Sequence, residues 1–148
     1  MACPYFMPTV KLESGTWMHP ARLPLGTGWM GHCCAPGHEQ AEPTQDELRE
    51  FCNLGYARCS RLPQEHAADA VRFSITRHCG DLLTVMFVFE LGHRPAEHGT
   101  LELDTRNQRW ITVHPNPRIQ RMAECFVESH MLRHHRPEPS NLPEIVHD

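Results

Sequence analysis

The feature that most constrains this chain is a set of cysteines near its N-terminus. Five of its seven cysteines lie within the first 59 residues, at positions 3, 33, 34, 52 and 59. Thiolates are soft ligands that select zinc, copper(I) or iron–sulfur clusters. Four thiolates brought together from separate loops are a common way to hold such a metal. The pattern therefore predicts a metal site, with the rest of the chain as its scaffold.

The predicted ligands are Cys3, Cys34, Cys52 and Cys59, with Cys33 as the substitute for its neighbour Cys34. No pair among them has the two-residue spacing of a zinc finger or ribbon, and no closely spaced histidine pair follows. Seventeen residues separate Cys34 from Cys52, and six separate Cys52 from Cys59. Such long spacings place the ligands on different loops. They favour a [4Fe-4S] cluster, with a structural zinc ion as the alternative.

Other side chains near these cysteines have possible roles at the same site. His32 and His38 flank the cysteine pair, and each is a candidate to replace one thiolate around zinc. A cluster bound by four thiolates carries excess negative charge, which nearby cations offset. The cationic candidates are Arg22, Arg58 and Arg61.

The remaining two cysteines, Cys79 and Cys125, are expected to lie outside the site. Cys79 falls in a predicted turn and Cys125 on a predicted helix, where a free cysteine behaves as a small apolar residue. The N-terminus lacks a basic segment followed by an apolar one, which predicts a cytoplasmic protein. Disulfides are rare in that compartment, and an odd number of cysteines fits a reducing setting.

The length and the net charge of the chain limit the number of domains and the kinds of function that it can have. The chain has 148 residues, which predicts one domain over residues 1–136, and a flexible tail over residues 137–148. Its net charge of −4 argues against a general nucleic-acid binder, since no basic excess exists to neutralise phosphates. No apolar run approaches the length of a membrane span.

Within the domain, residues 1–62 form a predicted cysteine-rich metal lobe. Residues 1–43 are rich in proline and glycine and predict irregular chain, with a short edge strand at Thr9–Leu12 as the alternative. Thr44–Tyr56 is a predicted helix, because Thr44 and Glu47 match a capping box. Gly55 is expected to end that helix and to turn Cys59 back toward Cys52.

Residues 70–136 are predicted to form a four-stranded antiparallel sheet packed by a C-terminal helix, which makes the fold class α+β. Apolar and polar residues alternate over the first of these strands, and the second is a rich apolar run expected to be central and covered on both faces. Asn116 is the expected cap of the final helix. The expected strands are Val71–Thr76, Leu82–Glu90, a third around Leu101–Leu103 and Trp110–Val113; Gly92–Gly99 is a predicted polar loop, and the helix runs from Pro117 to about Arg133.

The cysteine pattern also resembles a known one. Cys3-Pro4-Tyr5, then Cys34, seventeen residues, Cys52, six residues and Cys59 is similar to a motif in small uncharacterised bacterial cysteine-motif proteins. The resemblance covers about residues 1–62, and this chain departs from the motif by doubling the cysteine at positions 33 and 34. It implies an iron–sulfur site held by the four cysteines.

The expected function is therefore metal binding, with a [4Fe-4S] cluster used for electron transfer or redox sensing with a redox partner protein. The alternative is a zinc-stabilised protein-interaction module. A third reading is a thiol enzyme in which His32 or His38 activates Cys33. An enzyme is the weaker expectation, because no third orienting group stands at a recognisable spacing.

Overall fold

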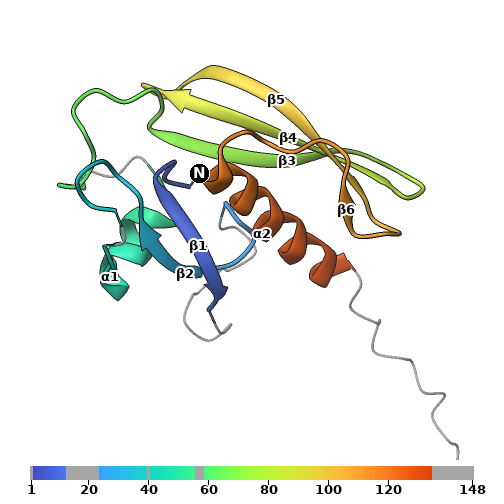
Figure 1. Cartoon of the computed structure of the whole chain (residues 1–148), viewed down its shortest axis with the longest axis horizontal. Helices are drawn as coiled ribbons and strands as arrows, with labels where there is room; N and C mark the ends of the chain where they lie inside the picture. The colour runs from blue at the N-terminus through green and yellow to red at the C-terminus, as the bar shows by residue number, and fades with distance from the viewer. Residues whose placement is uncertain (1, 13–23, 40, 56–58, 135–148) are drawn as a thin grey trace, which may run out of the picture.

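The computed structural model of the chain describes residues 2–12, 24–39, 41–55 and 59–134. The predicted tail therefore lies outside the described residues. Two sheets, a short helical segment and one long helix make up the fold, which Figure 1 shows. In chain order the elements are β1 (Phe6–Lys11), β2 (Trp29–Cys33), α1 (Gln45–Glu47), the π-helical turn η3 (Leu48–Cys52), β3 (Ala70–Cys79), β4 (Leu82–Leu91), β5 (Arg94–Asp104), β6 (Arg109–Trp110) and α2 (Pro117–His134).

The four-stranded sheet is an antiparallel meander in the order β3-β4-β5-β6, which confirms the predicted α+β class. The predicted polar loop over Gly92–Gly99 is wrong, since β5 already begins at Arg94. Gly92 and His93 alone form the turn, with φ angles of 60° and 62°. Two positive φ angles match the twist of a tight hairpin, so the strands pair right up to Leu91 and Arg94. The last strand is shorter than predicted, and Ile111 and Val113 beyond it are exposed.

Helix α2 packs across one face of this sheet and supplies much of the core (Figure 1). Its start is as predicted: the Asn116 side chain accepts a hydrogen bond from the Arg118 N–H at 3.0 Å. Phe126 is only partly buried and stacks on Phe73 of β3. Buried side chains of the helix are Ile119, Met122, Ala123, Cys125 and Val127, and those of the sheet that join the same core are Val71, Phe73, Leu83, Val85, Phe87, Leu101 and Leu103.

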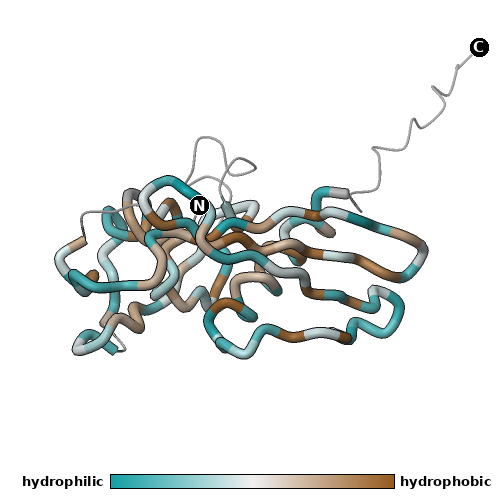
Figure 2. The backbone as a smooth tube through the Cα atoms, turned by 90° about the horizontal axis from the view of Figure 1, so that it is seen from above, coloured by the Kyte–Doolittle hydropathy of each residue, from teal (hydrophilic) through white to brown (hydrophobic). Residues whose placement is uncertain are grey.

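The expectation that β4 is central is confirmed, but it is not covered on both faces along its length. Buried and half-buried residues alternate from Leu82 to Met86, as in a strand with one covered face. Only near Val88 and Glu90 do both faces become buried. Figure 2 shows short hydrophobic stretches recurring along the strands between hydrophilic segments.

The N-terminal lobe is more regular than its composition predicts. β1 and β2 pair antiparallel, from Phe6 opposite Cys33 to Lys11 opposite Trp29, with an irregularity after Pro8. The predicted edge strand at Thr9–Leu12 thus begins three residues earlier. Gly31 allows the close approach of the strands, since a Cβ there would lie 2.0 Å from the Met7 carbonyl oxygen.

The predicted helix over Thr44–Tyr56 is also different in form. Both hydrogen bonds of the capping box between Thr44 and Glu47 are present. After the first turn, however, the helix widens into the π-helical turn η3, and the helical segment is capped at Asn53. Gly55 adopts a φ of 67°, which is the left-handed conformation expected of a residue that ends a helix. Tyr56 lies outside the described residues.

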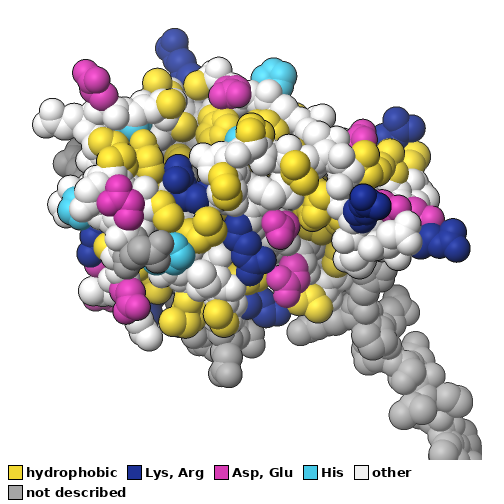
Figure 3. Space-filling model, in the orientation of Figure 1, with side chains coloured by type: hydrophobic (Ala, Val, Ile, Leu, Met, Phe, Trp, Pro, Cys, Tyr) yellow, Lys and Arg dark blue, Asp and Glu magenta, His cyan; other side chains and the backbone are white. Residues whose placement is uncertain are grey.

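The lobe joins the rest of the fold through α2 and β3. Arg118 and Arg121 of α2 donate hydrogen bonds to the carbonyl oxygens of Pro4 and Pro8, at 3.2 Å each. Ala2 exchanges two backbone hydrogen bonds with Val71. Figure 3 shows Lys and Arg side chains spaced over the seam between β1 and α2. In the described part of the chain, no helix is both long and apolar enough to cross a membrane.

Candidate metal centre

Four cysteines from separate segments surround one small cavity in the N-terminal lobe. They are Cys3, Cys33, Cys52 and Cys59. Three of these were predicted as ligands, and Cys33 was the predicted substitute. The rest of the lining is mainly apolar and consists of Tyr5, Phe6, Ala35, Phe51, Arg61 and Leu62.

Cys3 is held in place by the backbone on both sides. Its N–H donates to the Cys52 carbonyl oxygen at 3.1 Å, and its carbonyl oxygen accepts from the Phe6 N–H at 3.1 Å. Ala2 before it is pinned to β3. Cys3 is thus tied directly to the segment that carries Cys52.

Strand geometry decides between the neighbouring cysteines. Successive side chains of a strand point to opposite faces, so Cys33 shares a face of β2 with Trp29 and Gly31. Its partner across the ladder, Phe6, also lines the cavity. Cys34 follows the strand and is not among the lining residues, although its N–H donates to the Tyr5 carbonyl oxygen at 2.7 Å. The structure therefore places Cys33, and not Cys34, with the other three.

The π-helical turn positions Cys52. Asn53, which is 1% exposed, accepts a hydrogen bond from the Trp29 N–H and donates to the Trp29 and Leu48 carbonyl oxygens. This buried amide joins η3 to β2. Gly55 then redirects the chain, and Cys59 returns to the cavity as the sequence predicted.

Burial and the proximity of other thiols disfavour the charged forms of Cys3 and Cys52. Burial, together with the neighbouring Cys33 and Cys59, raises the pKa of Cys3 to about 11. Burial likewise raises the pKa of Cys52 to about 12, helped by the proximity of Cys3, Cys59 and Cys33. Without a cation nearby, these two thiols hold their protons at neutral pH. A bound metal cation supplies the opposite charge that the thiolates lack.

Backbone donors are nonetheless directed at two of the sulfurs. The backbone N–H groups of Tyr5 and Phe6 lower the pKa of Cys3 and so oppose the effect of burial. The Ala35 N–H donates to the Cys33 sulfur at 3.4 Å. Such donors stabilise sulfur that carries negative charge, and in iron–sulfur proteins they set the cluster potential.

Arg61 is the described cation at the cavity wall. It forms an ion pair with Glu47 at 2.7 Å, with both side chains 24% exposed. The pair connects the segment after Cys59 to the helical turn before Cys52. Arg22 and Arg58, the other predicted cations, lie outside the described residues.

The size of the cavity bears on what it can hold. Its volume is about 20 Å³, which is room for about one water molecule. Around one zinc ion, four sulfurs stand about 3.8 Å apart, from zinc–sulfur bonds of about 2.3 Å in a tetrahedron. Among the described residues, no group of three His, Cys, Asp or Glu side chains is arranged to hold one ion. Binding of either metal therefore requires the side chains around the cavity to rearrange.

Other predicted candidates lie elsewhere. Neither His32 nor His38 lines the cavity. Cys125 is fully buried on α2, as predicted, whereas Cys79 is the exposed last residue of β3 and pairs with Leu82, so it does not lie in the predicted turn. Burial raises the pKa of Cys125 to about 12, so this thiol is inert packing.

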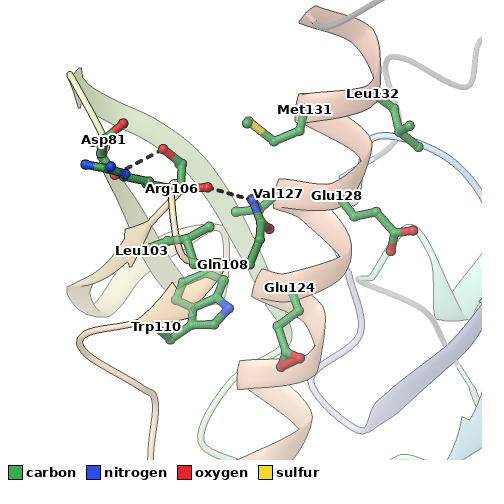
Figure 4. Close-up of a pocket in the computed structure, with 11 residues that line it drawn as sticks. Asp81, Leu103, Arg106, Gln108, Trp110, Glu124, Val127, Glu128, Met131 and Leu132 are labelled. Carbon is green, nitrogen blue, oxygen red and sulfur yellow. Dashed lines mark hydrogen bonds between the residues drawn. The ribbon is translucent and has the colours of Figure 1, made fainter.

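A larger cleft lies away from the cysteines, between the β5–β6 turn and the C-terminal half of α2. Its volume is about 730 Å³. Figure 4 shows Trp110 and Leu103 facing Val127 and Met131 across it. It contains no thiol, and nothing in the structure shows what would cover it.

Comparison with known proteins adds no relative. No protein-family model, curated protein or solved structure matches the chain. The resemblance to bacterial cysteine-motif proteins therefore stays a prediction.

Proposed function

We propose that this protein binds a metal through Cys3, Cys33, Cys52 and Cys59, and that the metal is a [4Fe-4S] cluster used in electron transfer or redox sensing. The observation that carries the proposal is the convergence of four thiols, from segments up to 56 residues apart, on one cavity. A four-cysteine set is the usual ligand set of such a cluster.

Three properties of the cavity support a cluster. The lining is mainly apolar, which excludes water and protects bound sulfide. Backbone N–H groups point at the Cys3 and Cys33 sulfurs, where a cluster needs hydrogen-bond donors. Cys59 completes the set of four thiols around the cavity, which is the number that such a cluster needs.

The residues have separable roles in this account. The four cysteines hold the metal, and the bound cluster supplies a one-electron redox couple. Phe6 and Phe51 exclude water from it, and Arg61 offsets part of its negative charge. The backbone N–H groups of Tyr5 and Phe6 favour the charged form of the Cys3 sulfur.

A structural zinc ion is the second candidate. It is favoured by the small free volume of about 20 Å³, since one ion needs less room than a cluster. In that case the metal would tie β1, β2 and η3 together as an interaction module. A thiol enzyme is not favoured, because no described histidine hydrogen-bonds to Cys33 and neither predicted histidine lines the cavity.

Metal analysis of the protein purified without oxygen distinguishes the candidates. A cluster predicts a brown protein with about four iron and four acid-labile sulfide per chain, and broad visible absorption that bleaches on reduction. A colourless protein with one zinc per chain would replace the cluster by the second candidate. A protein that binds neither metal after anaerobic reconstitution would contradict both.

A further inference from the structure

Another cleft shares the Tyr5 side of its lining with the cysteine cavity. Its volume is about 460 Å³, within the usual range of small-molecule sites. Tyr5 and the chain at Pro4 line it, and Tyr5 also lines the cysteine cavity. The remaining lining comes from the segment before β3, from the β4–β5 hairpin and from the start of α2: Ala67, Ala68, Phe89, Ala96, Glu97, His114, Pro115, Asn116, Arg118 and Ile119.

The Arg118 guanidinium lines this cleft and uses only part of its hydrogen-bonding capacity. Its Nε donates to the Pro4 carbonyl oxygen at 3.2 Å, and its guanidinium lies 5.5 Å from the centre of the Tyr5 ring. Within the described chain, its two terminal nitrogens have no hydrogen-bond partner and no carboxylate pairs with it. The guanidinium is thus held in position by one edge while the other edge stays available for an anion.

His114 adds a second donor of defined orientation. Its Nδ1 accepts a hydrogen bond from the Asn116 N–H at 3.0 Å, so the proton of the neutral ring is on Nε2. The ring is fixed edge-on against Phe87, with centroids 4.8 Å apart. In the part of the chain that the structure describes, no acceptor bonds to Nε2.

The walls between these donors are apolar and partly aromatic. The aromatic part of the lining comes from Tyr5 and Phe89. Pro4, Pro115 and three alanines contribute further apolar surface. Glu97 is the acidic residue of the lining and is exposed. The combination of two donors with flat apolar walls is complementary to an anionic group attached to a flat apolar body.

We propose that this cleft binds a small aromatic anion, with its carboxylate on the Arg118 guanidinium and on the Nε2–H of His114. Its apolar body lies between Tyr5 and Phe89. Binding at this cleft does not require the metal, so this proposal can be tested independently of the proposed function. Because Tyr5 lines both cavities, a ligand here would lie next to the proposed metal site.

Titration with two matched probes tests the chemistry of the site. We use 2-naphthoate and its neutral analogue 2-naphthamide, and follow the amide resonances of the full chain by NMR. The naphthoate is expected to bind with a dissociation constant below about 1 mM and to shift residues around Tyr5, Ala96 and Arg118. The naphthamide should bind about tenfold more weakly, because it lacks the charge-assisted hydrogen bonds. Equal affinity for both probes would contradict an anion site.

Arg118→Gln is the first variant, and Arg121→Gln is its matched control. Arg121 sits one turn along α2, donates to the carbonyl oxygens of Pro8 and Thr9, and lies 5.9 Å from the Trp29 ring, outside the cleft. The Arg118 variant should lose about tenfold in naphthoate affinity and little in naphthamide affinity. The control should lose neither.

Two further variants keep the test decisive if Arg118→Gln fails to fold. Ala67 is exposed at the rim, so Ala67→Trp should fill the cleft and abolish binding of both probes. Glu97→Gln removes the acidic residue and should strengthen naphthoate binding alone. Unchanged naphthoate binding in Ala67→Trp, or shifts confined to another surface, would overturn the proposal.

Discussion

The backbone N–H of Cys3 donates a hydrogen bond to the carbonyl oxygen of Cys52, across 48 intervening residues and at an N···O distance of 3.1 Å. Two of the four cavity thiols are therefore fixed relative to each other by the main chain. The convergence of the cysteines is a property of the fold, and a metal would strengthen an arrangement that the backbone already sets.

Asn53 should be essential for the shape of the lobe. Asn53→Ala leaves the buried N–H and carbonyl groups of Trp29 without their side-chain partner, which should cost about 2–4 kcal/mol of unfolding free energy. Urea denaturation measures the loss. Gln45→Ala, at an exposed position of α1, is the control and should change stability by less than about 0.5 kcal/mol. A loss below about 1 kcal/mol for Asn53→Ala would show that the amide does not join η3 to β2.

Gly31 should tolerate no side chain. In Gly31→Ala the new methyl group would lie 2.0 Å from the Met7 carbonyl oxygen and 2.7 Å from the Phe6 ring, so β1 and β2 must separate. Overpacking of this kind costs about 1–3 kcal/mol. The measured thermal midpoint should fall, and proteolysis should begin in the lobe before the four-stranded sheet. Met30→Ala, at a 48% exposed neighbour, should leave both unchanged. Equal behaviour of the two variants would contradict the close pairing of β1 and β2.

The His66–Asp69 pair should make stability depend on pH at both ends. The hydrogen bond to Asp69 raises the pKa of His66 above 6.5, and the Gly92 N–H and His66 lower the pKa of Asp69 below 3.8. A raised pKa of His66 stabilises the fold below pH 6.5, and that contribution is lost as pH rises through the folded pKa. The lowered pKa of Asp69 stabilises it above pH 3.8, and that contribution is lost as pH falls.

NMR titration of the His66 ring, with urea denaturation across the same range, checks this dependence. Asp69→Asn should shift the pKa of His66 downward and flatten the stability profile on the alkaline side. The Asn side chain still accepts from the Gly92 N–H, which preserves the turn. An unshifted His66 titration in Asp69→Asn would show that the pair does not form in solution.

The sequence predicted those parts of the fold that have a strong local signal. Alternating strands, the apolar stripe of α2 and the capping box at Thr44 each follow from residue type and spacing. The pairing of β1 with β2 did not follow, because Pro8 and Gly31 both weaken a strand pattern, and only the long-range contact explains them. The Gly92-His93 turn was missed for a similar reason, since histidine is an uncommon residue at positive φ.

The sequence predicted that cysteines form the candidate site, but it did not predict which of the two neighbouring cysteines faces the cavity. Spacing alone does not separate Cys33 from Cys34, because the choice depends on which face of β2 meets the cavity. Once Trp29 is known to be buried, the two-residue period places Cys33 on the same face, so the strand itself was the missing signal. Asn53 was missed altogether, since a single asparagine after a helix carries no sign of burial.

The most direct test of the four-thiol site compares Cys33→Ser with Cys34→Ser. Both variants are purified without oxygen, and the metal and sulfide per chain are measured beside the unmodified protein. Loss of a ligand opens a coordination position, so Cys33→Ser should lose most of its metal and melt earlier, whereas Cys34→Ser should retain both metal and stability. Full metal retention in Cys33→Ser, together with loss in Cys34→Ser, would contradict the assignment of the cavity as the metal centre.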